Sequence, residues 1–164
     1  MKKRICLVNE LGEIIGYENH EVVHDPNFPK MHLSVAVLVI LEPGDKIGLK
    51  KMNMNEEYPM LYDFAYHDHV YESELIDEKI KNVIKNFCEK CRAEISDYIY
   101  FYQYKKINAE YEFCKVISIF SQKEIKKETL HYISLKNLKN RDLFTPRVYG
   151  FIKYHLPHII NRLG

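Results

Sequence analysis

The chain contains 164 residues, a length that corresponds to one domain with a substantial hydrophobic core. Hydrophobic residues make up 46% of the chain and charged residues 29%, which are the proportions of an ordinary soluble globular protein. The formal net charge of +1 gives no electrostatic basis for binding nucleic acid, so we expect no nucleic-acid partner.

Two features argue against a membrane or secreted protein. The longest apolar run, Val35 to Leu41, is far too short to cross a bilayer. The segment from Met1 to Asn9 lacks the long apolar stretch of a signal peptide. We therefore expect a cytoplasmic protein without a membrane span. For the same reason we expect the four cysteines, Cys6, Cys88, Cys91 and Cys114, to be free thiols, with the Cys-x-x-Cys pair packed at a helix end.

The N-terminal part of the chain is predicted to consist mainly of strands. Residues 4–9 and 14–17 flank a turn at 10–13, which predicts a short hairpin. The run from Met31 to Leu41 is continuous and β-branched, as is typical of a strand buried on both faces. Residues 46–51 are expected to return antiparallel to it after a turn.

The rest of the chain alternates between strands and helices. We predict a strand over 62–70 that ends in two histidines, and a helix over 74–91 because apolar residues recur at intervals of three and four. Strands are predicted over 97–105 and 113–122, with a weaker one over 130–135. Thr145-Pro146 is a typical helix start, and Pro157 should kink or split that last helix. This order predicts a single α/β (α+β) domain over 1–164, with a mixed sheet and helices on both faces.

Two same-face pairs suggest a metal site. In a strand, residues two apart point to one face, so Glu110 and Glu112 form one pair and His67 and His69 another. Imidazole and carboxylate groups together suit a divalent metal. Spacing alone leaves open the alternative that both pairs lie on exposed strand edges.

The layout resembles the Nudix superfamily and, within it, the type I isopentenyl-diphosphate isomerases. The resemblance rests on the opening hairpin that leads to His24, on His32 at the head of the buried strand, and on His69, Glu74 and Glu110-x-Glu112. It implies a Nudix-like α/β/α sandwich with an N-terminal hairpin. It also implies that a divalent metal, Mn²⁺, Mg²⁺, Zn²⁺ or Fe²⁺, is held by His24, His32, His69, Glu110 and Glu112.

The Nudix box itself departs from the pattern of the resemblance. That pattern reads Gly-x5-Glu-x7-Arg-Glu-apolar-x-Glu-Glu-x-Gly. The corresponding places hold Asp68, Glu74, Asn82, Val83, Ile84, Asn86, Phe87 and Glu89. The acids that carry Mg²⁺ in Nudix hydrolases are therefore missing, which argues against diphosphate hydrolysis.

The positions that carry isomerase chemistry also differ. The catalytic cysteine of the isomerases corresponds to His67, and their aromatic residue after the last Thr-Pro corresponds to Arg147. Among the residues that grip the diphosphate, Lys51 is retained and His20 stands in for another. A guanidinium disfavours a neighbouring carbocation, so the original isomerisation is not expected.

Our leading hypothesis is an isomerase-like metalloenzyme with altered acid/base chemistry: isomerisation, cyclisation or elimination. Its substrate would be a prenyl diphosphate or another small anion, bound by Lys51, His20 and Arg147. Glu112 would act with Tyr104 on one face of the substrate and His67 on the other. The alternatives are an inactive metal-containing binding or regulatory protein and, with less support, a Nudix diphosphate hydrolase. We expect a monomer or homodimer.

Overall fold

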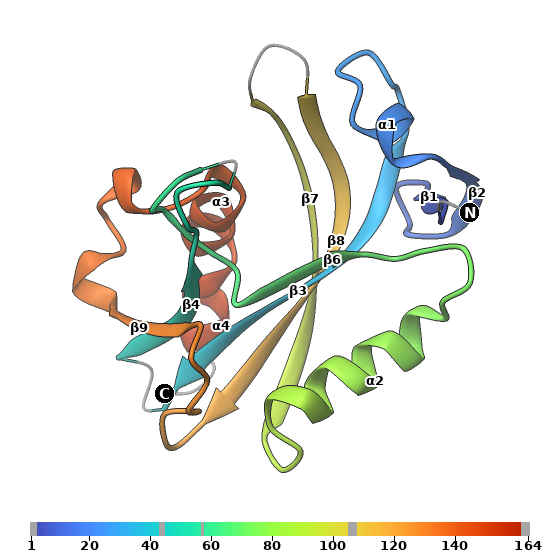
Figure 1. Cartoon of the computed structure of the whole chain (residues 1–164). Coiled ribbons are helices and arrows are strands. Elements are labelled where there is room, and N and C mark those ends of the chain that lie inside the picture. Colours follow the sequence, from blue (N-terminus) through green and yellow to red (C-terminus); the bar gives the residue numbers. More distant parts are fainter. Residues whose placement is uncertain (1–2, 43–44, 57, 105–107, 162–164) are drawn as a thin grey trace.

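A computed structural model of the chain describes residues 3–42, 45–56, 58–104 and 108–161 (Figure 1). Within these ranges nine strands form one mixed sheet, and the helices lie against its two faces. No helix among the described residues is long and apolar enough to cross a membrane.

Strand β3 (Met31–Leu41) is the centre of the sheet, as its β-branched sequence predicted. Along one edge it pairs in parallel with β8 (Asn108–Ser121). Along the other edge it pairs antiparallel with β1 (Ile5–Val8) at its start, β6 (Tyr66–His69) in its middle and β4 (Lys46–Lys51) at its end. Because both edges and both faces are covered, its first ten residues are all buried.

The predicted N-terminal hairpin is confirmed by the antiparallel pairing of β1 with β2 (Ile14–Glu18). Gly12 in its turn has a φ of 80°, a left-handed conformation that favours glycine. A Cβ at this position would lie 3.1 Å from the ring of Phe113. The turn therefore needs glycine both for its backbone and for its close approach to β8.

The strand predicted over 62–70 is divided into β5 (Tyr62–Asp63) and β6. The two halves have different partners, because β5 pairs with β4 whereas β6 pairs with β3. β4 also pairs with β9 (Leu130–Ser134), which is the weaker strand predicted over 130–135. The chain thus crosses from the β4 side of the sheet to its centre between Asp63 and Tyr66.

Both strands of the long hairpin formed by β7 (Arg92–Tyr104) and β8 begin earlier than predicted, at Arg92 where residue 97 was expected and at Asn108 where residue 113 was expected. Helix α2 (Ile76–Phe87) lies within the predicted range and covers one face of the sheet. Helices α3 (Pro146–Tyr154) and α4 (Leu156–Asn161) cover the other face. The short elements are α1 (His20–Val23), η1 (Leu135–Asn137) and η2 (Arg141–Leu143).

Alternate residues of β3 supply the two halves of the core. Leu33, Val35 and Val37 join the cluster that contains Ile80 and Val83 of α2. Ala36, Leu38 and Ile40 join the cluster that contains Phe151 and Leu156 of α3 and α4. This arrangement confirms that helices lie on both faces of the sheet.

Two further sequence predictions have clear outcomes. The last helix is split as expected, because α3 ends before His155 and α4 begins next to Pro157, which has no N–H to continue a helix. The prediction of four free thiols is wrong. Cys88 and Cys91 form a disulfide because the turn after α2 brings their Cα atoms within 5.4 Å, while Cys6 and Cys114 are free and buried.

Candidate metal centre

The strand register places several polar side chains on one face of the sheet. His32 of β3 is paired with Glu112 of β8, and Glu112 is paired in turn with Tyr100 of β7. On the other side of β3, His69 of β6 is paired with Ser34. Directly paired residues point to the same face, so the imidazoles of His32 and His69 lie on the face that bears Glu112. This is the face covered by α3 and α4.

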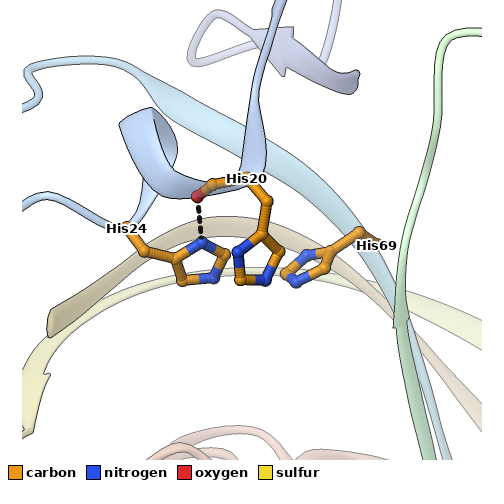
Figure 2. A group of neighbouring side chains, drawn as sticks. All are labelled: His20, His24 and His69. Carbon is orange, nitrogen blue, oxygen red and sulfur yellow. Dashed lines mark hydrogen bonds between the residues drawn. The ribbon is translucent and has the colours of Figure 1, made fainter. Parts of the chain in front are cut away.

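The turn of α1 adds His24 to this group. Its Nδ1–H donates to the carbonyl oxygen of His20 at 2.7 Å (Figure 2). This leaves Nε2 directed at Glu110 Oε1, 3.0 Å away. The carbonyl of His24 accepts a hydrogen bond from the N–H of Ala109 at 2.9 Å. The loop before β3 is thereby tied to the start of β8, next to Glu110.

The three histidines and two glutamates predicted as metal ligands therefore form one cluster. The ring centroids of His24, His32 and His69 lie 5.1 Å from one another. His32 Nε2 is 3.3 Å from Glu110 Oε2 and 3.6 Å from Glu112 Oε1. His69 Nδ1 is 3.9 Å from Glu112 Oε1. In two groups, His24–His32–Glu110 and His32–His69–Glu112, the possible ligand atoms all lie within 4.8 Å of one another.

The electrostatics of the cluster favour the metal-binding forms of Glu110, Glu112 and His69. Burial and the nearby Glu112 act to raise the pKa of Glu110, but the hydrogen bond from His24 and the neighbouring imidazoles outweigh them and lower it. Burial likewise opposes ionisation of Glu112, but the charge and hydrogen bond of His67 hold its pKa well below the usual range. Burial lowers the pKa of His69 to about 3, so its imidazole is neutral. Ionised carboxylates and neutral imidazoles are metal-binding forms. For His24, burial acts to lower the pKa, but the hydrogen bond and charge of Glu110 outweigh it and raise the pKa, so a metal would displace a proton there.

Unpaired buried nitrogens test whether a metal fits here. Within the described residues, neither ring nitrogen of His32 has a hydrogen-bond partner, and neither does Nδ1 of His69. A buried polar atom without a partner costs free energy, and a coordinated cation would remove that cost. The mixed imidazole and carboxylate donors suit a divalent transition metal. The residues present fit such an ion.

A second set of polar contacts lies beside the cluster. His67 Nε2 is 3.0 Å from Glu112 Oε1, and the Tyr100 hydroxyl donates a hydrogen bond to Glu112 Oε2. The same hydroxyl is 3.4 Å from His67 Nε2. The side chain of His67 is 11% exposed, whereas that of Glu112 is fully buried. An imidazole, a carboxylate and a phenol are thus in contact at the edge of the cluster.

Tyr100 was not identified from the sequence, which suggested Tyr104 for this role. The backbone of Tyr104 pairs with Asn108, but its side chain lies outside the described residues, so its role stays a prediction. The hairpin register places Tyr100 opposite Glu112. Counting equal distances outward from the pair Tyr104 and Asn108 would have identified Tyr100.

The three residues predicted to bind substrate have different surroundings. His20 stacks on His24 at a centroid distance of 4.1 Å. Lys51 Nζ lies 5.8 Å from the centroid of the Tyr62 ring, and the structure gives it no hydrogen bond or ion pair to the cluster within the described residues. Arg147 is buried next to the cluster, with Nη1 3.9 Å from Glu112 Oε2.

Arg147 is held by a buried ion pair with Asp63. Its Nε and Nη2 donate to the two carboxylate oxygens at 2.9 and 2.5 Å, and the hydroxyl of Thr145 donates to Asp63 Oδ1 at 2.9 Å. Burial opposes ionisation of Asp63, but the charge of Arg147 outweighs it and lowers the pKa of the carboxyl. The pair fixes the start of α3 against β5, beside Glu112.

We expect Arg147→Met to lower the free energy of unfolding by about 3–5 kcal/mol, because it leaves the carboxylate of Asp63 buried and unpaired. Urea denaturation followed by circular dichroism measures this change. The matched control is Arg92→Met, which removes an arginine with a half-exposed side chain and should cost less than about 1 kcal/mol. Equal losses in the two variants would contradict a structural role for the buried pair.

Comparisons with known proteins identify the fold. No family model matches the chain, and the search of curated proteins finds no match. Similar solved structures include DR0079 from Deinococcus radiodurans, at 12% identity and a TM-score of 0.62 over 92% of this chain and 98% of that one. The dihydroneopterin triphosphate pyrophosphohydrolase of E. coli matches at 10% identity and 0.55, over 77% and 95%. A Nudix-family hydrolase from Clostridium perfringens matches at 14% and 0.50, over 77% and 97%.

At such identities these similarities concern the fold alone, and they show that the chain has a Nudix-like fold.

Proposed function

We propose that this protein is a divalent-metal enzyme, related to the type I isopentenyl-diphosphate isomerases, that carries out altered acid/base chemistry on a prenyl diphosphate or another small anionic substrate. The observation that carries this proposal is the buried cluster of three imidazoles and two carboxylates with His67 hydrogen-bonded to one of the carboxylates. A cluster kept only for stability would not need a partly exposed imidazole in contact with a ligand carboxylate.

His24, His32, His69, Glu110 and Glu112 would hold the metal. When bound, the ion supplies a positive charge that neutralises the two carboxylates and polarises a coordinated oxygen. His67 would give or take a proton at Nε2, the atom that contacts Glu112 Oε1. Tyr100 would keep Glu112 in place by donating to Oε2, so that the orientation of Oε1 toward His67 is fixed.

The preference for an anionic substrate comes from the resemblance, because burial lowers the pKa of His20 and Asp63 balances the charge of Arg147. Lys51 and His20 are the proposed anion contacts, whereas Arg147, whose charge is balanced by Asp63, would form a wall beside Glu112. A guanidinium in this position does not favour a long-lived tertiary carbocation. We therefore propose isomerisation through a different proton path, cyclisation or elimination, in place of ordinary isopentenyl-diphosphate isomerisation.

Diphosphate hydrolysis is the second candidate, since four of the similar structures are hydrolases by name. Three observations argue against it. Glu74, the first acid of the Nudix box, accepts hydrogen bonds from Lys79 Nζ at 3.0 and 2.9 Å. The later acidic positions of the box hold Val83, Asn86 and Phe87. Finally, α2 packs on the face of the sheet opposite to the histidine cluster. An inactive metal-containing binding protein is the remaining alternative.

We expect turnover of isopentenyl diphosphate to dimethylallyl diphosphate far below 1 s⁻¹, a rate that is ordinary for enzymes. The reason is that His67 and Arg147 occupy the positions of the isomerase thiol and aromatic residue. The assay incubates the Mn²⁺-loaded protein with isopentenyl, dimethylallyl, geranyl or farnesyl diphosphate and follows products by NMR and mass spectrometry. Isopentenyl-diphosphate turnover near 1 s⁻¹ would show that the original reaction is retained. Release of inorganic phosphate or diphosphate as the only product would favour the hydrolase.

A further inference from the structure

The segment from His20 to His24 has a spacing that the proposed function does not use. It reads His-Glu-Val-Val-His, the arrangement in which two histidines four apart on a helical turn bind one zinc ion. The turn is helical here, since the N–H of His24 donates to the carbonyl oxygen of His20 at 3.3 Å. Since His24 already belongs to the cluster, this spacing makes His20 a candidate ligand of the same metal centre.

His20 lies against two members of the cluster. Its ring stacks on His24 at a centroid distance of 4.1 Å and an interplanar angle of 27°. Its edge faces His69, with centroids 5.6 Å apart and an angle of 78°. Figure 2 shows the three rings side by side. The possible ligand nitrogens of His20, His24 and His69 all lie within 4.8 Å of one another, as close as those of the two mixed groups.

Two of the three imidazoles, those of His20 and His69, lie on the outer side of the cluster, and His24 is buried next to them. His20 is exposed and the side chain of His69 is 12% exposed, whereas His24 is buried and His32 is fully buried. Glu110 and Glu112 are also buried, on the inner side. The cluster therefore has an outer edge of nitrogen donors and an inner part that contains its carboxylates.

We propose that His20, His24 and His69 form an outer metal position that takes Zn²⁺ or Co²⁺, next to the inner position that contains the carboxylates. Three imidazoles with a free fourth place suit a tetrahedral zinc ion, whereas Mn²⁺ and Mg²⁺ prefer oxygen donors. This inference rests on the proposed function, because His24 and His69 are shared between the two positions. It also changes the role of His20, which contacts the anion when the inner position is filled and the metal when the outer position is filled. Nδ1 of His24 is hydrogen-bonded to the carbonyl oxygen of His20, so only Nε2 of His24 can bind a metal. Because this one nitrogen cannot bind an ion in both positions at once, the two positions compete for one ion.

The direct test is His20→Ala in the full chain. We expect its Kd for Zn²⁺ and Co²⁺, measured by chelator competition, to rise at least about tenfold, because one of three nitrogen ligands is lost. The visible absorption of bound Co²⁺ should also change, while the Kd for Mn²⁺ measured by EPR should stay within about twofold. His131→Ala is the matched control, since it removes an exposed imidazole on β9 and should change none of these values.

A second variant separates the two positions. In Glu110→Gln with Glu112→Gln, we expect Mn²⁺ binding to be lost while one equivalent of Co²⁺ or Zn²⁺ remains. Unchanged Zn²⁺ and Co²⁺ affinities and an unchanged Co²⁺ spectrum in His20→Ala would overturn the outer position and leave the inner one in place. Undiminished Mn²⁺ affinity in the double glutamate variant would instead overturn the inner position, and with it the proposed function. Circular dichroism confirms that each variant is folded.

Discussion

Replacing Glu110 and Glu112 together by glutamine is expected to abolish Mn²⁺ binding while the fold is preserved. The two carboxylates supply all the charged donors of the cluster, and Mn²⁺ depends on oxygen ligands more than zinc does. Glutamine keeps the size of each side chain and a hydrogen-bonding oxygen opposite His24 and Tyr100. We expect the Kd for Mn²⁺ to rise at least about 100-fold.

The same variant should lose the stabilisation that metal binding gives. At a free Mn²⁺ concentration 100 times its Kd, the wild type gains about 2.7 kcal/mol, which corresponds to roughly 5–10 °C in Tm for a chain of this size. The variant should show no such rise. Elemental analysis after purification without chelators gives the stoichiometry. Glu124→Gln with Glu128→Gln removes the same charge from exposed positions and serves as the control.

Two results would count against this centre. One is less than about a tenth of an equivalent of any transition metal in the wild type after reconstitution. The other is an equal Tm shift on adding Mn²⁺ to the wild type and to the glutamine variant.

The elements that the sequence predicted best are those whose pattern is local. The continuous β-branched run of β3 and the three-and-four spacing of α2 each reflect burial that is set along one segment. The division between β5 and β6 was missed, because it depends on which strand each half pairs with. The disulfide between Cys88 and Cys91 was missed because the cellular location assumed for the chain argued for thiols.

The site shows a similar limit. Same-face spacing within β6 and β8, together with the resemblance, was enough to nominate five residues that the structure brings together. The contacts between distant segments were not predictable in this way. Asp63 and Arg147 are 84 residues apart, and Lys79 supports the cluster by donating to the carbonyl oxygen of His69 at 2.8 Å. Such partners depend on the strand order and on the placement of α2 and α3, which no local pattern encodes.

The second large effect is expected for His67→Ala, which should lower turnover of the substrate by about 10² to 10⁴ while metal content and folding stay normal. His67 is outside the groups whose ligand atoms converge in the described residues, and its Nε2 is already in contact with Glu112. Its side chain is partly exposed, so a substrate that reaches Glu112 can also reach the imidazole. An imidazole can accept a proton at one ring nitrogen while the other nitrogen donates a hydrogen bond, which suits it to proton transfer.

Three measurements on the same sample distinguish the roles open to His67. The first is metal content, the second is thermal unfolding, and the third is turnover of whichever prenyl diphosphate the wild type converts, followed by NMR in D₂O to detect exchanged hydrogens. His69→Ala is the comparison for a ligand and should lose metal affinity. His131→Ala is the comparison for a histidine away from the site and should change nothing.

The pattern of these results decides the role. If His67 were a sixth ligand, His67→Ala would resemble His69→Ala and lose metal. If it only formed a wall of the site, metal content and turnover would both match the wild type, and the acid/base proposal would be wrong. We expect a third pattern, with full metal occupancy, an unchanged Tm and the loss of both product formation and deuterium exchange. That combination requires a group that moves a proton without holding the ion, and the 3.0 Å contact between His67 Nε2 and Glu112 Oε1 places an imidazole where it can do so.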